Sequence, residues 1–241
     1  MDKQGIQINK YISSTGYCSR READQMIAQC RVMINDSIAL PTSKVSERDK
    51  VYVDDELLKK KKSGSTYIML NKPVGITTTT DTADRTNVIS FINYQKRIFP
   101  IGRLDKDSEG LLLLTDDGDI VNKILRAGNQ HDKEYIVTVN KSITNEFISK
   151  MAGGVPILGT KTLPCKVHQL SGKKFSIILT QGLNRQIRRM CDYLGYEVTS
   201  LTRVRIMNIK LDKLPTGQWR SLNAMEIAEL QRLLSHSSKT M

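Results

Sequence analysis

A charged segment near residue 60 constrains the fold of this chain more than any other feature. The segment Lys59–Thr66 reads KKKKSGST and contains no apolar residue. Such a stretch has nothing to bury in a hydrophobic core, so it favours a linker. We therefore predict two domains, residues 1–63 and residues 64–241, each with a core of its own.

The net charge indicates the kind of partner. The 241 residues include 37 Lys and Arg but 25 Asp and Glu, which gives a formal net charge of +12. Residues 1–62 carry 12 basic and 9 acidic side chains, so most of the excess lies in the second domain. A positive excess favours a polyanionic partner, with nucleic acid first. The alternative is a basic surface that serves solubility alone.

Several classes of protein are disfavoured. The chain has no apolar run near the roughly 18 residues that a membrane span needs, and its start, MDKQGIQINKY, lacks the apolar region of a secretory signal. We expect a cytoplasmic protein with no membrane association. The four cysteines share no C-x-x-C spacing and lie far from the three histidines, so we expect neither a metal site nor a disulfide framework. Phosphate-binding loops of the G-x-x-x-x-G-K-[ST] and G-x-G-x-x-G types are absent from the sequence.

The first domain begins with two predicted helices. Apolar residues recur at helical spacing in residues 8–12, and Gly16 is placed to end that helix. The second helix begins with the capping sequence Ser-x-x-Glu at Ser19–Glu22. Two short strands are predicted at residues 32–34 and 51–53. The apolar face of the second helix is predicted to consist of Ala23, Met26, Ile27 and Cys30.

Arg20 and Arg21 occupy the first turn of the second helix, where cations oppose the helix dipole. A phosphate at the helix start compensates for that cost, because free backbone amides already point outward there. The pair therefore indicates phosphate binding, with two solvated arginines as the alternative.

Residues 8–36 resemble the small RNA-binding domain named after ribosomal small-subunit protein four, and their sequence is INKYISSTGYCSRREADQMIAQCRVMIND. In that family the helix pair contacts structured RNA. The resemblance implies that four basic residues touch RNA, namely Lys10, Arg20, Arg21 and Arg31.

The second domain contains an acidic, glycine-bearing segment before four leucines. The segment FPIGRLDKDSEG precedes Leu111–Leu114, which has the length of a buried strand. A loop lying against a sheet commonly carries catalytic groups. Its acids, Asp105, Asp107 and Glu109, suit metal ligands, acid–base groups or a solvated loop, although EF-hand spacing is absent. Asp105, with Arg103 two residues before it, is the candidate for an ionised nucleophile.

Two further strands are predicted in this domain. Tyr67–Leu70 is short and apolar, and it ends in the turn sequence NKPVGIT. After His131 the pattern alternates, so that Tyr135, Val137 and Val139 share one face. Tyr135 is most simply an aromatic side chain at the edge of the core. At a nucleic-acid site it is a ring on which a base stacks.

The segment QGLNRQIRRMCDYLG predicts an amphipathic helix with an arginine-rich face. Its apolar stripe recurs at i, i+3, i+4 and i+7, at Ile187, Met190, Cys191 and Leu194. Arg185 and Arg189 lie opposite this stripe, whereas Arg188 lies on its flank and can turn toward a buried carboxylate. Asn184 is the candidate N-cap. Residues 185–205 carry five arginines, which fits bidentate phosphate contact better than a merely solvated face.

Together these segments resemble the pseudouridine synthases that modify ribosomal RNA and carry the small RNA-binding domain in front. The resemblance rests on four motifs in the family's order: LNKPVGI, FPIGRLDKDSEGLLLLTDDGD, KEY and QGLNRQIRRMCDYLGYEV. The stretches RLDKDSEGLLLLTDDGDIVNKILRAGN and RIMNI resemble the F type of this family.

The resemblance implies a role for each matching residue. Asp105 matches the aspartate that attacks the flipped uridine, and Arg103 matches the arginine that contacts or replaces the extruded base. Tyr135 matches the tyrosine that stacks on the uracil and is proposed to assist proton removal from its carbon five. Arg188 matches the arginine that pairs with the aspartate. Further RNA contacts are expected from Lys72, Asn184, Arg185 and Arg189.

The implied fold is α+β, with a catalytic domain built on a mainly antiparallel mixed sheet. The implied reaction detaches a uracil from its ribose, rotates it and rejoins it through carbon five, without metal or cofactor. We expect a monomer that acts on a hairpin of large-subunit ribosomal RNA, and the alternative substrate is a transfer-RNA loop. The competing hypothesis is a non-catalytic RNA-binding factor in ribosome assembly. A pure binder would not require Asp105, Tyr135 and Arg188.

Overall fold

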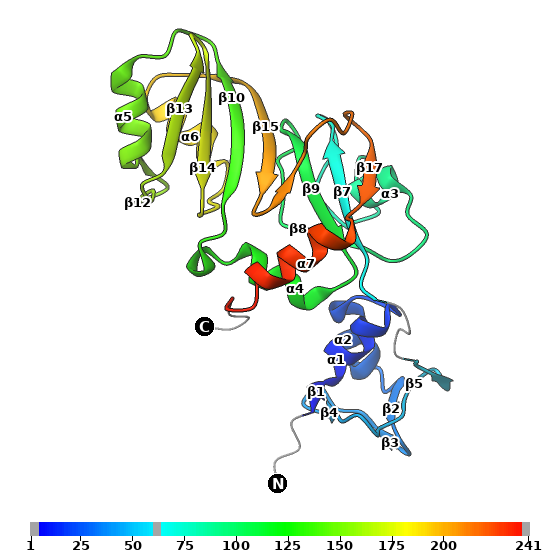
Figure 1. The fold of residues 1–241 in the computed structure, drawn as a ribbon. Helices are drawn as coiled ribbons and strands as arrows, with labels where there is room; N and C mark the ends of the chain where they lie inside the picture. The colour runs from blue at the N-terminus through cyan, green and yellow to red at the C-terminus, as the bar shows by residue number, and fades with distance from the viewer. Residues whose placement is uncertain (1–4, 60–63, 238–241) are drawn as a thin grey trace. The chain divides into compact units, whose positions relative to one another are not determined.

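The computed structural model describes residues 5–59 and 64–237 (Figure 1). The chain divides into two compact units, Met1–Ser65 and Thr66–Met241. This division lies two residues after the boundary predicted from the sequence, which falls between residues 63 and 64. The middle of the predicted linker, residues 60–63, lies outside the described residues. None of the helices formed by the described residues has the length and apolar character that crossing a membrane requires.

The N-terminal unit packs two helices against short strands. Its order is β1 (Ile6–Gln7), α1 (Ile8–Thr15), α2 (Arg20–Ala28), β2 (Val32–Ile34), β3 (Ser37–Ile38), β4 (Lys44–Val45), β5 (Val51–Val53) and β6 (Glu56–Leu57). Strands pair in the order β3-β2-β5-β6, and β1 pairs with β4. The core under the helices includes Ile8, Ile12 and Ile27.

Both helix boundaries in this unit follow the predicted signals. Gly16 adopts φ 87° at the end of α1, and Ser19 and Glu22 form a reciprocal capping box at the start of α2. The predicted position of Cys30 on the apolar face is wrong, because α2 ends at Ala28. Cys30 is exposed and has φ 56°, a left-handed conformation that turns the chain toward β2.

The described residues of the second unit form one nine-stranded mixed sheet with the main order β13-β14-β10-β15-β9-β7-β17. Among these strands β15 and β9 are parallel neighbours, and the other paired strands are antiparallel. The predicted α+β class is therefore confirmed. The strands are β7 (Tyr67–Lys72), β8 (Phe99–Ile101), β9 (Glu109–Thr115), β10 (Lys133–Val139), β13 (Lys166–Ser171), β14 (Lys174–Leu179), β15 (Val198–Ile206), β16 (Ile209–Lys210) and β17 (Trp219–Ser221). A small separate hairpin is formed by β11 (Pro156–Ile157) and β12 (Thr160–Lys161).

The leucine run forms a strand that is buried on both faces. On one face Leu111 and Leu113 pack with residues of α4 (Gly118–Leu125) and α7 (Ala224–Leu233). On the other, Leu112 and Leu114 pack with residues of α3 (Val88–Ile92). Figure 1 shows α4 and α7 together below the middle of the sheet. The 3-10 turn η1 (Ala127–Asn129) follows α4 in the chain.

A separate core fills the other end of the sheet. There α5 (Asn145–Gly153) and α6 (Gln186–Tyr193) pack against β10, β13, β14 and β15. Tyr135 on β10 packs both against this core and against the core around Leu112. It therefore lies where the two halves of the sheet meet.

The halves meet at a short parallel seam between β9 and β15. Its register pairs Thr202 with Glu109 and Arg203 with Gly110. Gly110 has φ 104°, and a Cβ there would lie 2.4 Å from the Arg203 carbonyl oxygen. Only glycine fits this conformation and this close approach. The seam thereby brings the loop that precedes β9 against β15.

Candidate active site

Two of the three predicted catalytic residues, Asp105 and Tyr135, meet in one cavity at this seam, and the third, Arg188, lies outside it. The cavity has a volume of about 480 Å³, and its wall includes Asp105, Tyr135, Arg103, Asn184 and Arg185. These residues come from the loop before β9, from β10 and from the segment before α6. The structure thus gathers side chains that lie far apart in the sequence, and a cavity of this size accommodates a small ligand group.

Asp105 lies on a backbone that is fixed on both sides. The Thr78 hydroxyl donates to the Leu104 carbonyl at 2.8 Å, and the Ser108 amide donates to the Asp105 carbonyl at 3.0 Å. Leu104 is buried, whereas the Asp105 side chain is 35% exposed. An Arg185 guanidinium nitrogen lies 3.7 Å from the carboxylate. The carboxylate is held in place and still accessible, which suits a nucleophile.

Tyr135 is positioned by both of its neighbouring strands. Tyr135 lies on β10, and its cross-strand neighbours are Arg203 on β15 and Ile177 on β14. The ring is partly buried and lines the cavity. A ring in this position offers a flat surface to a planar base.

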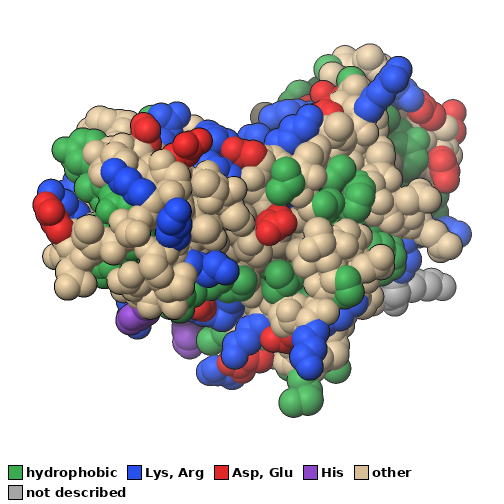
Figure 2. Space-filling model, turned by 90° about the horizontal axis from the view of Figure 1, so that it is seen from above, with side chains coloured by type: hydrophobic (Ala, Val, Ile, Leu, Met, Phe, Trp, Pro, Cys, Tyr) green, Lys and Arg blue, Asp and Glu red, His purple; other side chains and the backbone are tan. Residues whose placement is uncertain are grey.

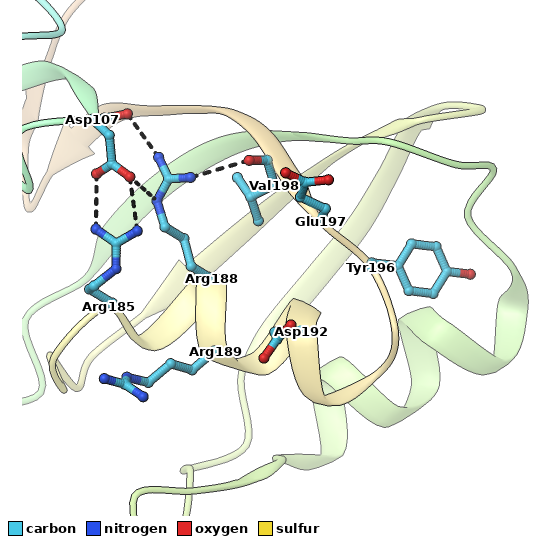
Figure 3. A pocket seen from close by; sticks show the side chains of 8 residues that line it. All are labelled: Asp107, Arg185, Arg188, Arg189, Asp192, Tyr196, Glu197 and Val198. Carbon is cyan, nitrogen blue, oxygen red and sulfur yellow. Dashed lines mark hydrogen bonds and ion pairs between the residues drawn. The ribbon is translucent and has the colours of Figure 1, made fainter.

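Arg185 and Arg188 are held by Asp107 (Figure 3). Arg185 makes a bidentate contact with Asp107, at 3.0 and 2.8 Å, and its hydrogen bonds hold the pKa of that carboxyl below its usual value. Arg188 places its Nε 3.3 Å from the Asp107 carboxylate and donates to the Asp107 carbonyl at 2.8 Å. It also donates to the Val198 carbonyl at 3.2 Å, which fixes the guanidinium away from the cavity.

The predicted partner of Arg188 was Asp105, and the structure pairs it with Asp107 instead. The loop turns between these two acids, so that Asp107 lies over the start of α6 while Asp105 faces the cavity. A second, more open pocket of about 430 Å³ lies beside the first and is drawn in Figure 3. Its lining includes Asp107 and the arginines Arg185, Arg188 and Arg189. Sequence spacing missed this role of Asp107 because either acid is within reach of the helix.

Asn184 does not cap α6, contrary to the prediction. The N-cap is Arg185, in a left-handed conformation with φ 48°, and it makes no side-chain cap hydrogen bond. Asn184 instead accepts from Arg189 through its side-chain oxygen and its backbone carbonyl, both at 3.1 Å. Arg189 remains exposed. Figure 2 shows basic and acidic side chains interspersed over the face seen there, rather than one positive area.

Lys72 was expected to contact RNA, and the structure buries it completely. It is 0% exposed, and its Nζ donates to the carbonyls of Pro73 and Ile76 at 2.8 Å each. Burial lowers its pKa to about 8, although the nearby charges of Asp107 and Asp105 oppose the shift. Lys72 is therefore a charge inside the protein and is not a surface contact.

Two of the five arginines in residues 185–205 also face the protein. Arg203 is 3% exposed, and Arg205 pairs with Glu134 at 2.8 Å and Asp132 at 3.5 Å. Arg203 lines the cavity, as does the buried Lys133. Sequence reasoning gave neither residue a place in the site, because their location depends on the pairing of β10 with β15.

The basic residues of the N-terminal unit differ in availability. Arg20 and Arg21 are exposed, Lys10 is half-buried, and Arg31 donates to Asp54 at 2.8 Å. The predicted RNA contacts of these four residues stay predictions. In the part of the chain that the structure describes, no group of three or more His, Cys, Asp or Glu side chains is placed to hold a metal ion.

Comparisons with known proteins agree with this geometry. Residues 66–193 match the family described as RNA pseudouridylate synthase. The dual-specificity RNA pseudouridine synthase RluF of Salmonella typhi is 55% identical over 96% of this chain and 81% of its own length. The ribosomal large subunit pseudouridine synthase B of Bacillus subtilis is 34% identical over 95% of this chain and 97% of its own.

A solved structure extends the likeness to the fold. The crystal structure of a pseudouridylate synthase covers 95% of this chain and 99% of its own, with 30% identity and a TM-score of 0.69. The sequence relatives and this structure each span both units of the chain, and the expected resemblance to the F type is confirmed. The chain therefore belongs to the family of RNA pseudouridine synthases, and it is an isomerase.

Proposed function

We propose that Asp105 attacks the ribose of a uridine that has been turned out of its stack into the cavity, and that Tyr135 stacks on the released uracil. The observation that supports this proposal is the single cavity of about 480 Å³ lined by both side chains. Asp105 either attacks carbon one of the sugar or assists loss of a proton from carbon two. Both routes break the glycosidic bond and free the ring to rotate.

The basic side chains around the cavity hold the RNA backbone in this proposal. Arg103 contacts the extruded base or fills its place in the stack, and Arg185 and Arg189 contact phosphates. Arg188 acts indirectly, by fixing the position of Asp107 at the start of α6. In the N-terminal unit, Arg20 and Arg21 bind phosphate at the start of α2, with Lys10 and Arg31 beside them.

The substrate is a hairpin of large-subunit ribosomal RNA, with a transfer-RNA loop as a second substrate. This choice is supported by the relatives, one named as a dual-specificity enzyme and another as a large-subunit enzyme. A loop is favoured because turning a base out of it costs less than turning one out of a helix. The enzyme acts as a monomer in the cytoplasm, where it meets ribosomal RNA.

Tritium release tests the function directly. Large-subunit, small-subunit and transfer RNA, each labelled at carbon five of uracil, are incubated with the full-length protein. We expect release from large-subunit RNA and from transfer RNA, and none from small-subunit RNA. Release confined to transfer RNA would contradict the proposed main substrate. If all three RNAs, and ribosomal particles, release nothing, the alternative of a non-catalytic assembly factor takes its place.

The variant Asp105→Asn tests the nucleophile. The substitution keeps size and removes the attacking carboxylate, so we expect at least about a 10⁴-fold lower rate. RNA affinity should stay unchanged, since the carboxylate would not attract phosphate. Asp192→Asn is the matched control, because Asp192 is exposed and lies outside the cavity. Full activity of Asp105→Asn would rule out the assignment.

A further inference from the structure

Arg203 is a buried cation in the wall of the cavity. It lies opposite Tyr135, so that the two side chains share one face of the sheet. Its Nε donates to the Leu111 carbonyl at 2.7 Å, and its Nη1 lies 3.5 Å from the Arg103 carbonyl. Its Nη2 has no hydrogen-bond partner among residues 5–59 and 64–237. A buried guanidinium with an unused donor is costly unless an anionic or polar group joins it.

Lys133 places a second cation in the same wall. It is 7% exposed, and its Nζ donates to the His131 carbonyl at 3.2 Å. Burial lowers the pKa of Lys133, and the positive charge of Arg203 lowers it further. Two cations that repel each other in a buried site favour the binding of an anion between or beside them, because the anion offsets their repulsion. Asp105 lines the same cavity, but it forms its ion pair with Arg185, at 3.7 Å.

The reaction produces such an anion for part of its course. When the bond between N1 of uracil and C1′ of ribose breaks, the electron pair leaves with the uracil. The negative charge then spreads over N1, O2 and O4 of the ring. The ring loses this charge when C5 bonds to C1′. In the attack route the aspartate leaves the sugar as a carboxylate in the same step, and in the elimination route the carboxyl group returns its proton to carbon two of the sugar. The proton on C5 is then removed and N1 gains a proton, which leaves a neutral ring. Neutral uridine carries no such charge, so a fixed cation beside the ring lowers the barrier rather than only strengthening binding.

We propose that Arg203, assisted by Lys133, stabilises the negative charge of the uracil ring while it is detached from the ribose. This inference rests on the function proposed above. It assigns the two cations to the base, whereas Asp105 serves the sugar. The competing explanation is purely structural, because Arg203 also connects the carbonyls of Leu111 and Arg103.

A change of leaving group separates the two explanations. Arg203→Met and the wild-type protein are compared under single-turnover conditions on the RNA that releases tritium. That RNA is made with uridine or with 4-thiouridine at the target. Sulfur accommodates the negative charge better than oxygen, so the thio base depends less on a nearby cation. We expect about a hundredfold slower reaction of uridine, by analogy with loss of one oxyanion donor, and a clearly smaller factor for 4-thiouridine. RNA affinity should be unchanged.

Arg205→Met is the matched control, since it removes the same charge from the same strand, outside the cavity. It should react like the wild type with both bases. Equal slowing of the two bases by Arg203→Met would assign Arg203 a structural role and overturn the proposal, as would no slowing. If circular dichroism shows Arg203→Met unfolded, Lys133→Met replaces it and is judged by the same two criteria. A wild-type protein that converts no RNA would refute the proposed function, and this inference with it.

Discussion

The two units use positive charge in opposite ways. In the N-terminal unit Arg20 and Arg21 are exposed at the start of a helix, where water and salt screen them. In the catalytic unit Lys72, Lys133 and Arg203 are buried near the loop that carries Asp105. Exposed cations attract a polyanion from a distance. Buried cations act only on what enters the site, and they do so strongly because water is excluded.

This contrast shows that a net charge of +12 does not describe one surface property. Part of the basic excess is suited to binding RNA, and part lies inside the protein, where it cannot touch a phosphate backbone. Salt should therefore weaken RNA binding and leave the chemical step on bound RNA nearly unaffected. The variants below test this contrast, beginning with the largest expected effect.

Gly110→Ala should disrupt the seam between β9 and β15, which positions the buried Arg203. The new Cβ would lie 2.4 Å from the Arg203 carbonyl oxygen, on backbone with φ 104°. We expect a loss of about 4 kcal/mol in the free energy of unfolding, measured by urea denaturation. Gly75→Ala is the control, because Gly75 also has a positive φ, 91°, but has open space around it. Equal losses in the two variants would refute the steric argument.

The charge on Lys72 should make stability depend on pH. Its pKa is lowered from 10.5 to about 8 by burial, so the native state loses the proton before the unfolded state does. Below pH 8 both states are charged, and burial of the charge is a full cost. Between pH 8 and 10.5 the cost is relieved, and the free energy of unfolding rises by up to about 3 kcal/mol. The free energy of unfolding of the wild type and of Lys72→Met is measured at pH 7 and at pH 10. Relative to the variant, the wild type should be more stable at pH 10 than at pH 7. A constant difference would contradict the shift.

Asp107→Asn should make the positions of Arg185 and Arg188 less fixed, while both positive charges stay in place. Arg185 and Arg188 would lose their shared carboxylate, and the rate on bound RNA should fall by up to about a hundredfold through misplacement. RNA affinity should hold or rise, since Arg185 becomes available to phosphate. Asp192→Asn is the control. Asp192 lines the same pocket as Asp107, and its variant should have the rate and RNA affinity of the wild type. A loss of affinity with an unchanged rate would reverse this assignment.

Replacing Arg20 and Arg21 by Gln should give the smallest effect, and only on binding. Each lost phosphate contact should reduce the salt slope of RNA affinity by about 1. The rate on saturating RNA should not change. Arg31→Gln sharpens the comparison, because Arg31 is already paired with Asp54 and should matter less. A slower chemical step in the double variant would link the N-terminal unit to catalysis.

Local patterns predicted much of this structure. The capping box of α2, the buried leucine strand and the apolar stripe of α6 depend on neighbours within a few residues, and all three are present. The sequence also pointed to Asp105 and Tyr135, and the structure places both in one cavity. Their catalytic roles stay predictions.

The rest depends on contacts between distant segments. Whether Arg188 meets Asp105 or Asp107 depends on how one loop turns over a helix. Whether Arg203 is exposed depends on its register with Gly110 across the seam. Hydrophobic period carries no information on either point, because a lysine or arginine looks the same in sequence whether water or a sheet surrounds it.

The parallel seam also has a consequence for the order of folding. Antiparallel neighbours such as β13 and β14 or β7 and β9 can pair within each half of the sheet. The β9–β15 seam has two registered residue pairs, and it joins segments that are far apart along the chain. Closing so long a loop for so few contacts is entropically unfavourable, so we expect the seam to form late. Recovery of isomerase activity during refolding should therefore lag behind recovery of secondary structure.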